Sequence, residues 1–229
     1  MRALGRSAAV GLVALALLGP GWAAAPAAGQ SPREGALASR ERALADLGRA
    51  DDAGARRAAV QKLAEVGEIA DLPALAKTLR DADPGVRASA EEAMWQVWSR
   101  SGEDAVDQLF AGGVEQMRRR RLDDAIATFS QVIRRKPEFA EGWNKRATVY
   151  FMLGDYTKSL SDCDEVVRRN PYHWGALSGY GMIYLQLDQP ARALEYFEKA
   201  LAVNPNLSRV EDTIEELKAL VIQRRKDSI

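Results

Sequence analysis

Cysteine and histidine are almost absent from this 229-residue sequence, which has one residue of each type, Cys163 and His173. A single cysteine cannot form a disulfide within the chain, and one Cys with one His cannot supply the ligands of a Cys/His zinc site. Any Ser-His or Cys-His catalytic pair would have to use His173 alone. These absences exclude disulfide scaffolds and zinc fingers, and they leave few classes of enzyme.

An excess of charge of one sign is also absent, because 32 Lys and Arg residues balance 32 Asp and Glu residues. A chain without net charge has no general attraction for nucleic acid, so we expect no nucleic-acid partner. The one Gly-Gly pair in the folded region, Gly112-Gly113, lacks the Lys-Ser/Thr that completes a phosphate-binding loop. The sequence therefore predicts no cofactor and no metal site.

Residues 1–28 have the features of a secretory signal peptide. Arg2 and Arg6 precede the apolar run Ser7–Leu18, a helix-breaking Gly19-Pro20 follows, and residues 23–28 are rich in alanine. The apolar run is shorter than the roughly 20 residues of a membrane span. We therefore expect export, cleavage within residues 24–28, and a mature chain without a stable membrane span. The location would be periplasmic in a Gram-negative bacterium, and an uncleaved anchor is the alternative.

The second half of the chain has a sequence repeat. Its period is the interval from Pro137 to Pro171. Six columns of similar residues recur in register in three successive copies. They are Pro137, Pro171 and Pro205; Phe129, Cys163 and Phe197; Ala125, Ser159 and Ala193; Gly113, Ala147 and Gly181; Leu109, Trp143 and Leu177; Gln116, Tyr150 and Tyr184. This pattern resembles the tetratricopeptide repeat, a helix-turn-helix unit of about 34 residues. Within 102–207, the repeats would occupy 106–139, 140–173 and 174–207.

A further helix is expected after the last repeat, within residues 208–229. Its apolar residues form one stripe, as expected of a helix that covers the end of a repeat array. They are Val210, Ile214, Leu217, Leu220 and Val221.

Residues 36–101 show a different repetition, preceded by a linker over 29–35. The segments Ala55–Val60 and Gly85–Ala90 are similar to each other and share a Val-Arg or Arg-Arg pattern. A leucine-rich run followed by Asp81-Ala82-Asp83-Pro84 resembles a HEAT-like repeat. That resemblance implies structural hydrogen bonds from Asp81, Asp83, Arg57 and Arg87 between successive units. We expect Trp95 and Trp98 to pack across the join with the next domain at Ser99–Glu103.

The predicted fold class is therefore all-α, an α-solenoid of HEAT-like repeats followed by three tetratricopeptide repeats and a capping helix. No catalytic residue is predicted. Cys163 occupies a core column, His173 is expected at the surface or stacked in a turn, and Asp162, Asp164 and Glu165 are interpreted as a solvated helix face. An unrecognised enzyme is the less favoured reading.

The resemblance implies a concave groove lined by the first helix of each repeat. The groove positions that would contact a protein or peptide partner are Phe110, Val114, Met117, Asn144, Thr148, Phe151, Ser178, Met182 and Leu185. The alternative is that some of these side chains belong to the core. Chaperone-adaptor members of the family hold a C-terminal carboxylate with a Lys, Asn and Arg clamp. The matching columns here hold Phe110, Val114, Lys145, Gly175 and Gly179, so that clamp is absent.

Arg118, Arg119, Arg120 and Arg121 form the densest run of charge, at the turn inside the first repeat. Asp123 and Asp124 follow at once, so a neutralised solvated turn is one reading and an anion-binding patch is the other. The sequence as a whole predicts a non-enzymatic exported scaffold that binds a protein or peptide in the groove. The alternative is an envelope protein that contacts an acidic protein or a lipid headgroup through Arg118–Arg121.

Overall fold

A computed structural model describes residues 32–48 and 52–227 of the chain. Over these residues the chain forms α-helices joined by short turns, with one 3-10 turn at Ile69–Asp71 and no β-strand. The all-α prediction is confirmed. The predicted signal peptide lies outside the described residues, and the first helix begins at Pro32, inside the predicted linker.

The N-terminal unit consists of helices α1 (Pro32–Asp46), α2 (Ala53–Val66), α3 (Leu72–Thr78) and α4 (Pro84–Trp98). α2 packs against both α1 and α4, and α3 packs against α4. Two aspartates begin these helices as N-caps: Asp52 accepts from the N–H groups of Gly54 and Ala55, and Asp83 from that of Val86. The Arg–Asp bonds implied by the HEAT-like resemblance connect α2 to the turn before α4, but the half-buried Asp81 pairs with Arg56 and not with Arg57. Arg57 pairs with Asp83, and Arg87 donates to the carbonyl of Asp81.

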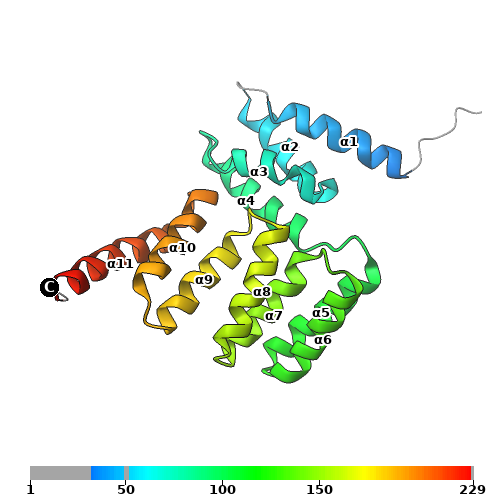
Figure 1. Ribbon diagram of the computed structural model, residues 1–229. Helices are drawn as coiled ribbons and strands as arrows, with labels where there is room; N and C mark the ends of the chain where they lie inside the picture. Colours follow the sequence, from blue (N-terminus) through cyan, green and yellow to red (C-terminus); the bar gives the residue numbers. More distant parts are fainter. Residues whose placement is uncertain (1–31, 49–51, 228–229) are drawn as a thin grey trace, which may run out of the picture.

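The predicted repeats form three helix pairs, drawn from green to orange in Figure 1. The pairs are α5 (Asp104–Arg118) with α6 (Leu122–Arg135), α7 (Ala140–Met152) with α8 (Tyr156–Arg169), and α9 (Trp174–Gln186) with α10 (Pro190–Val203). The last helix is α11 (Ser208–Asp227). Each turn within a pair is only a few residues long, so the two helices of a pair run antiparallel.

Small residues on the first helix of a pair allow the second helix to approach closely. A Cβ atom added to Gly113 would lie 2.6 Å from Cε1 of Phe129, and one added to Gly181 would lie 2.7 Å from the ring of Phe197. Real Cβ atoms do not approach other atoms so closely, so the aromatic ring fills the space that the glycine leaves open.

α11 covers the end of the array, as predicted from its apolar stripe. Ile214 and Leu217 are buried and form one cluster with Ala193 and Phe197 of α10. α11 therefore shields one face of the last repeat from water.

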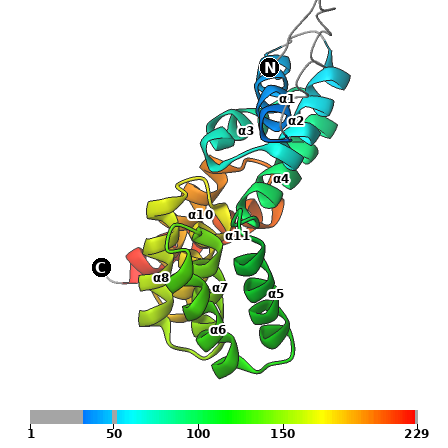
Figure 2. The same cartoon turned by 90° about the vertical axis from the view of Figure 1, so that its right-hand side faces the viewer.

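The N-terminal unit lies against the turns at one edge of the third repeat. Trp95 and Trp98 of α4 contact Trp174 at ring-centroid distances of 5.7 Å and 4.3 Å. Nδ2 of Asn206 donates to the carbonyl of Leu79 at 2.9 Å. Figures 1 and 2 both show α3 and α4 beside the C-terminal end of α10. The two tryptophans therefore pack across a domain contact, as predicted, but the surface they meet is formed by His173 at the end of the second repeat and Trp174 at the beginning of the third.

The helices of residues 32–48 and 52–227 include none with the length and apolar character of a membrane span.

Candidate partner-binding groove

A buried histidine and glutamate support the centre of the repeat array. His173 is the N-cap of α9, where its Nδ1 accepts the N–H of Ala176 at 3.1 Å. Nε2 must then carry the ring proton, and it donates to Oε2 of Glu141 at 2.8 Å. The ring stacks on Trp98 at 4.5 Å. The stacking role predicted for His173 is correct, but a surface position is wrong because this side chain is completely buried.

Glu141 connects this buried cluster to the surface of α7. Its carboxylate accepts from Nδ2 of Asn144 and from Nζ of Lys145, each at 3.0 Å. Burial alone would raise the pKa of Glu141, but the hydrogen bonds from His173 and Lys145, with the positive charge of Lys145, hold the pKa below its usual value. Glu141 is therefore ionised, and it fixes the orientation of the Asn144 amide.

A cleft of ≈140 Å³ opens between α7 and α9, next to Asn144. Side chains of α7 form one wall, α9 forms the other, and α8 supplies the floor. The lining residues are Asn144, Ala147, Thr148, Phe151, Ser159, Cys163, Gly175, Ala176, Gly179, Met182 and Ile183. Because Gly175 and Gly179 have no side chains, the wall on the α9 side is low and the cleft remains open.

Four of the nine predicted groove residues meet in this cleft: Asn144, Thr148, Phe151 and Met182. Met182 is 43% exposed, which is high for a large apolar side chain.

The other five predicted groove residues lie elsewhere. Phe110 packs against the rings of Phe129 and Phe139 at 5.8 Å and 5.3 Å, and Val114 and Met117 belong to the same core region. Leu185 packs in the cluster of α10 and α11, and Ser178 is half-buried without lining the cleft. For Phe110, Val114, Met117 and Leu185 the core reading therefore describes the structure better.

The sequence places Gly175 on the groove face, but the prediction did not use the small size of Gly175 and Gly179. Gly179 was noted only as a position where a carboxylate clamp fails, although two glycines at four-residue spacing on one helix face signal an open wall. The floor residues Ser159 and Cys163 were identified only as core positions.

No charged residue of the described chain lines the cleft. α9 contains no Asp, Glu, Lys or Arg over its length, and none of the cleft-lining residues is charged. The nearest charges on α7 are paired: Lys145 with Glu141, and Arg146 with Asp162. The solvated position expected for Asp162 is wrong, because Asp162 is buried and accepts two bonds of 2.8 Å from the Arg146 guanidinium.

Cys163 is a buried thiol, as expected from its column in the repeat. Burial, with a smaller effect from the charges of Asp162 and Asp164, raises the pKa of Cys163 to about 12. A thiol of that kind is protonated at neutral pH and is a poor nucleophile.

The arginine run at the α5–α6 turn is largely paired. Arg118 and Arg119 both donate to Glu115, and Arg121 donates to Asp124 at 2.7 Å. Hydrogen bonds from Arg118 and Arg119 lower the pKa of Glu115 to about 2. The four arginines are exposed, and Asp123 and Asp124 lie beside them. In the part of the chain that the structure describes, no three His, Cys, Asp or Glu residues gather as metal ligands.

Comparison with known proteins matches two adjoining segments of the chain. Residues 110–174 and residues 174–207 each match a family model described as tetratricopeptide repeat. A tetratricopeptide repeat-containing protein of Rhizobium etli is 32% identical over 126 residues, which cover 55% of this chain and 62% of that protein. The Hsp70-Hsp90 organizing protein of Triticum aestivum is 24% identical over 102 residues, which cover 44% of this chain and 18% of that protein. This chain thus spans less than two thirds of either relative.

Among solved structures, the tetratricopeptide domain of Sgt2 from Aspergillus fumigatus superposes with a TM-score of 0.51 at 21% identity. The superposition covers 54% of this chain and 83% of that domain, and it establishes similarity of fold. The HEAT-like identity of residues 36–101 stays a prediction.

Proposed function

Since residues 110–207 match models of the tetratricopeptide repeat, we propose that this chain is a non-enzymatic scaffold that binds a peptide segment of a protein partner. The observation that carries the proposal is the uncharged cleft between α7 and α9, which gathers Asn144, Thr148, Phe151 and Met182. Helical repeats present such surfaces for recognition of extended or helical segments.

The chemistry of the cleft favours a partner with an uncharged aliphatic anchor. A volume of ≈140 Å³ suits a single side chain of the size of Leu, Ile or Met. A charged side chain would lose its hydration there without gaining a counter-ion, because the lining residues carry no charge.

Asn144 supplies the polar contact. Its Nδ2 is engaged by Glu141, so the amide is held in one orientation with Oδ1 directed away from that carboxylate. We assign Oδ1 the role of accepting a backbone N–H of the bound peptide.

The chemistry of the buried groups supports a role other than catalysis. The His173 and Glu141 side chains are hydrogen-bonded to each other in the interior, and the Cys163 thiol is protonated at neutral pH. Export remains part of the proposal and rests on residues 1–28; mass spectrometry of the mature N-terminus tests it. A mature chain beginning within residues 25–29 supports export, whereas a chain beginning at Met1 contradicts it.

Peptide selection tests the site itself. The full chain would be used to select peptides from a random library, and affinities of the selected peptides would be measured by calorimetry. Met182→Glu and Thr148→Arg should each weaken binding by at least about tenfold, because each places a charge in the cleft. Ile69→Glu is the matched control, since Ile69 is also an exposed apolar residue at 48% but lies in the N-terminal unit.

Two results would contradict the proposal. Selected peptides that bind the Met182→Glu and Thr148→Arg variants as tightly as the wild type would place the site elsewhere. A library that yields no binding peptide would remove peptide recognition as the function of this cleft.

A further inference from the structure

α11 occupies the register of a fourth repeat. α7, α9 and α11 begin at Ala140, Trp174 and Ser208, so the step from α9 to α11 equals the step from α7 to α9. α8 and α10 begin at Tyr156 and Pro190, so a second helix of a fourth repeat would begin at Arg224. α11 instead continues as one helix to Asp227. Among residues 208–227, α11 is therefore a first helix without its second.

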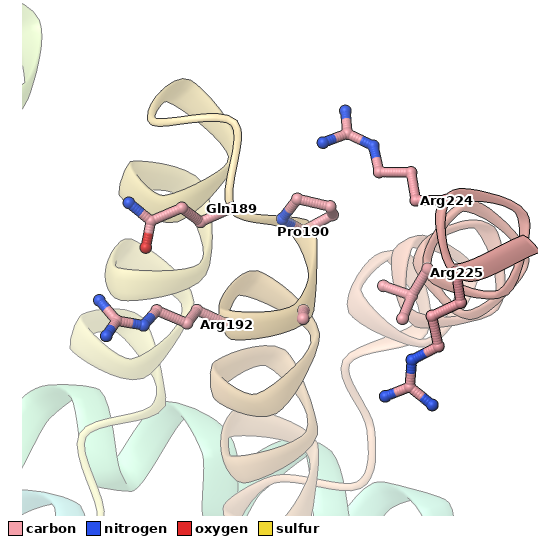
Figure 3. A pocket seen from close by; sticks show the side chains of 7 residues that line it. Gln189, Pro190, Arg192, Arg224 and Arg225 are labelled. Carbon is pink, nitrogen blue, oxygen red and sulfur yellow. The ribbon is translucent and has the colours of Figure 1, made fainter. Parts of the chain in front are cut away.

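The place of that second helix is an open cleft. A hollow of ≈690 Å³ lies between the beginning of α10 and the end of α11, and it is lined by Gln189, Pro190, Ala191, Arg192, Val221, Arg224 and Arg225. Figure 3 shows Arg224 and Arg225 extending from α11 on either side of this space, with Pro190 opposite. Leu220 and Ile222 are 39% and 55% exposed, but they lie on opposite sides of α11, and neither lines the hollow. Val221 is the apolar residue of α11 that lines it. A first helix in this register normally has the face around Val221 covered by its partner.

Four acidic residues and the basic last turn of α11 lie in opposite halves of the helix. The first half holds Glu211, Asp212, Glu215 and Glu216, and the last turn holds Arg224, Arg225 and Lys226. Within the described chain, no ion pair joins Glu211, Asp212, Glu216, Arg225 or Lys226 to another residue. A second α11 laid antiparallel would place its acidic half against the basic half of the first, and the reverse.

We propose that two copies of this chain associate through α11, each α11 taking, in the other copy, the position that the second helix of a repeat holds beside the first. The antiparallel direction is the one that the second helix of a repeat adopts beside the first. The acidic half of one α11 then lies beside Arg192, Arg224 and Arg225 of the other, and Val221 is covered by the partner helix. This interface is separate from the proposed peptide cleft between α7 and α9.

Sedimentation velocity of the full chain over a concentration series tests the association. The wild type should shift from monomer to dimer as its concentration rises. Val221→Asn should weaken the dimer by at least about tenfold, and Leu153→Asn, which changes an exposed apolar residue in the α7–α8 turn, should not.

Charge reversal tests the antiparallel pairing. The acidic variant Arg225→Glu/Lys226→Glu and the basic variant Glu211→Lys/Asp212→Lys leave the Arg224–Asp188 pair intact. Each variant alone should remain monomeric, because like charges would then face each other. An equimolar mixture should form a heterodimer, which native mass spectrometry resolves after isotopic labelling of one variant.

Circular dichroism establishes that both variants keep the helical content of the wild type. A wild type that stays monomeric at its highest soluble concentration overturns the proposal and assigns the cleft to another protein. A mixture that stays monomeric, or single variants that dimerise like the wild type, overturns the antiparallel arrangement.

Discussion

Nε2 of His173 and Oε2 of Glu141 are 2.8 Å apart, and neither side chain is more than 1% exposed. The pair joins the turn before α9 to the first turn of α7, two segments that are 32 residues apart in the chain. Because the His173 ring also stacks on Trp98 of α4, this bond lies where the second repeat, the third repeat and the N-terminal unit meet.

Substitution of either partner should destabilise the whole protein. His173→Ala leaves the ionised, buried Glu141 carboxylate without one of its hydrogen-bond donors, which should cost about 1.5–3 kcal/mol. Lys62→Met is the control, because both members of the Lys62–Glu65 pair are exposed. Urea unfolding measures both free energies. A His173→Ala variant as stable as Lys62→Met would show that the buried bond has no structural importance.

Acid should weaken the fold through Glu141. Burial acts to raise the pKa of Glu141, but His173 and Lys145 together hold it below the usual value of 4.5. A group with a depressed pKa in the folded state adds stability above its unfolded pKa, and this stability is lost as the pH falls through the folded pKa. The free energy of unfolding of the wild type should therefore decrease as the pH falls below 4.5. Glu141→Gln should show a smaller decrease over the same range, and equal pH profiles would contradict the assignment.

Gly112 and Gly113 are neighbours in α5 and should respond in opposite directions to substitution by alanine. A Cβ at Gly112 meets no atom within 4 Å, so Gly112→Ala should stabilise the protein by about 0.5–1 kcal/mol through helix propensity. A Cβ at Gly113 would lie 2.6 Å from the Phe129 ring, so Gly113→Ala should destabilise it by about 1–3 kcal/mol through overpacking. Thermal unfolding of the two variants compares them directly. Similar shifts of Tm for both would mean that α5 and α6 are further apart than the structure places them.

The Cys163 thiol should be protected from alkylation in the folded protein. Its pKa of about 12 leaves a thiolate fraction at pH 8 that is about a thousandfold lower than for a free thiol. The rate of modification by iodoacetamide should therefore be very slow without denaturant and should rise sharply in urea. Fast modification of the folded protein would show that the cleft above Cys163 opens to admit the reagent.

The Arg146–Asp162 pair should matter more for stability than the exposed pairs of α8. Asp162 is buried and receives two bonds from Arg146, which also donates to Ser130 at 2.9 Å. Arg146→Met should cost several kcal/mol, because it leaves the Asp162 charge buried and unpaired. Arg168→Met removes an exposed partner of Glu165 and should have a far smaller effect. Equal urea midpoints for the two variants would contradict this ranking.

The repeat period predicted the helices and much of the core, because a periodic array repeats its local packing. Phe129 and Phe197 lie in equivalent positions for this reason, and so do Gly113 and Gly181. The capping role of α11 followed from its apolar stripe, and Ile214 and Leu217 are buried as that stripe predicts.

Contacts between distant segments could not be predicted in the same way. His173 is polar and follows a turn-forming Pro171, so only the approach of Trp98 and Glu141 explains its burial. Asp162 has the sequence context of an exposed helix residue, and the Arg146 guanidinium comes from the preceding helix. The structure brings four of the predicted groove residues into one cleft, where Gly175 and Gly179 keep α9 low. Phe110 does not reach that cleft, because its ring packs inside the first repeat.

The bond between Asn206 and the Leu79 carbonyl has a consequence for cooperativity. A linear array of repeats can lose its terminal units one at a time, because each unit contacts only its neighbours. Here the bond joins segments 127 residues apart, and the tryptophans of α4 reinforce that contact. The terminal repeat is thereby tied to the first folded unit, so the third repeat cannot fray without releasing the N-terminal helices. During synthesis the N-terminal unit must likewise wait until the third repeat has been made before its tryptophan surface is covered.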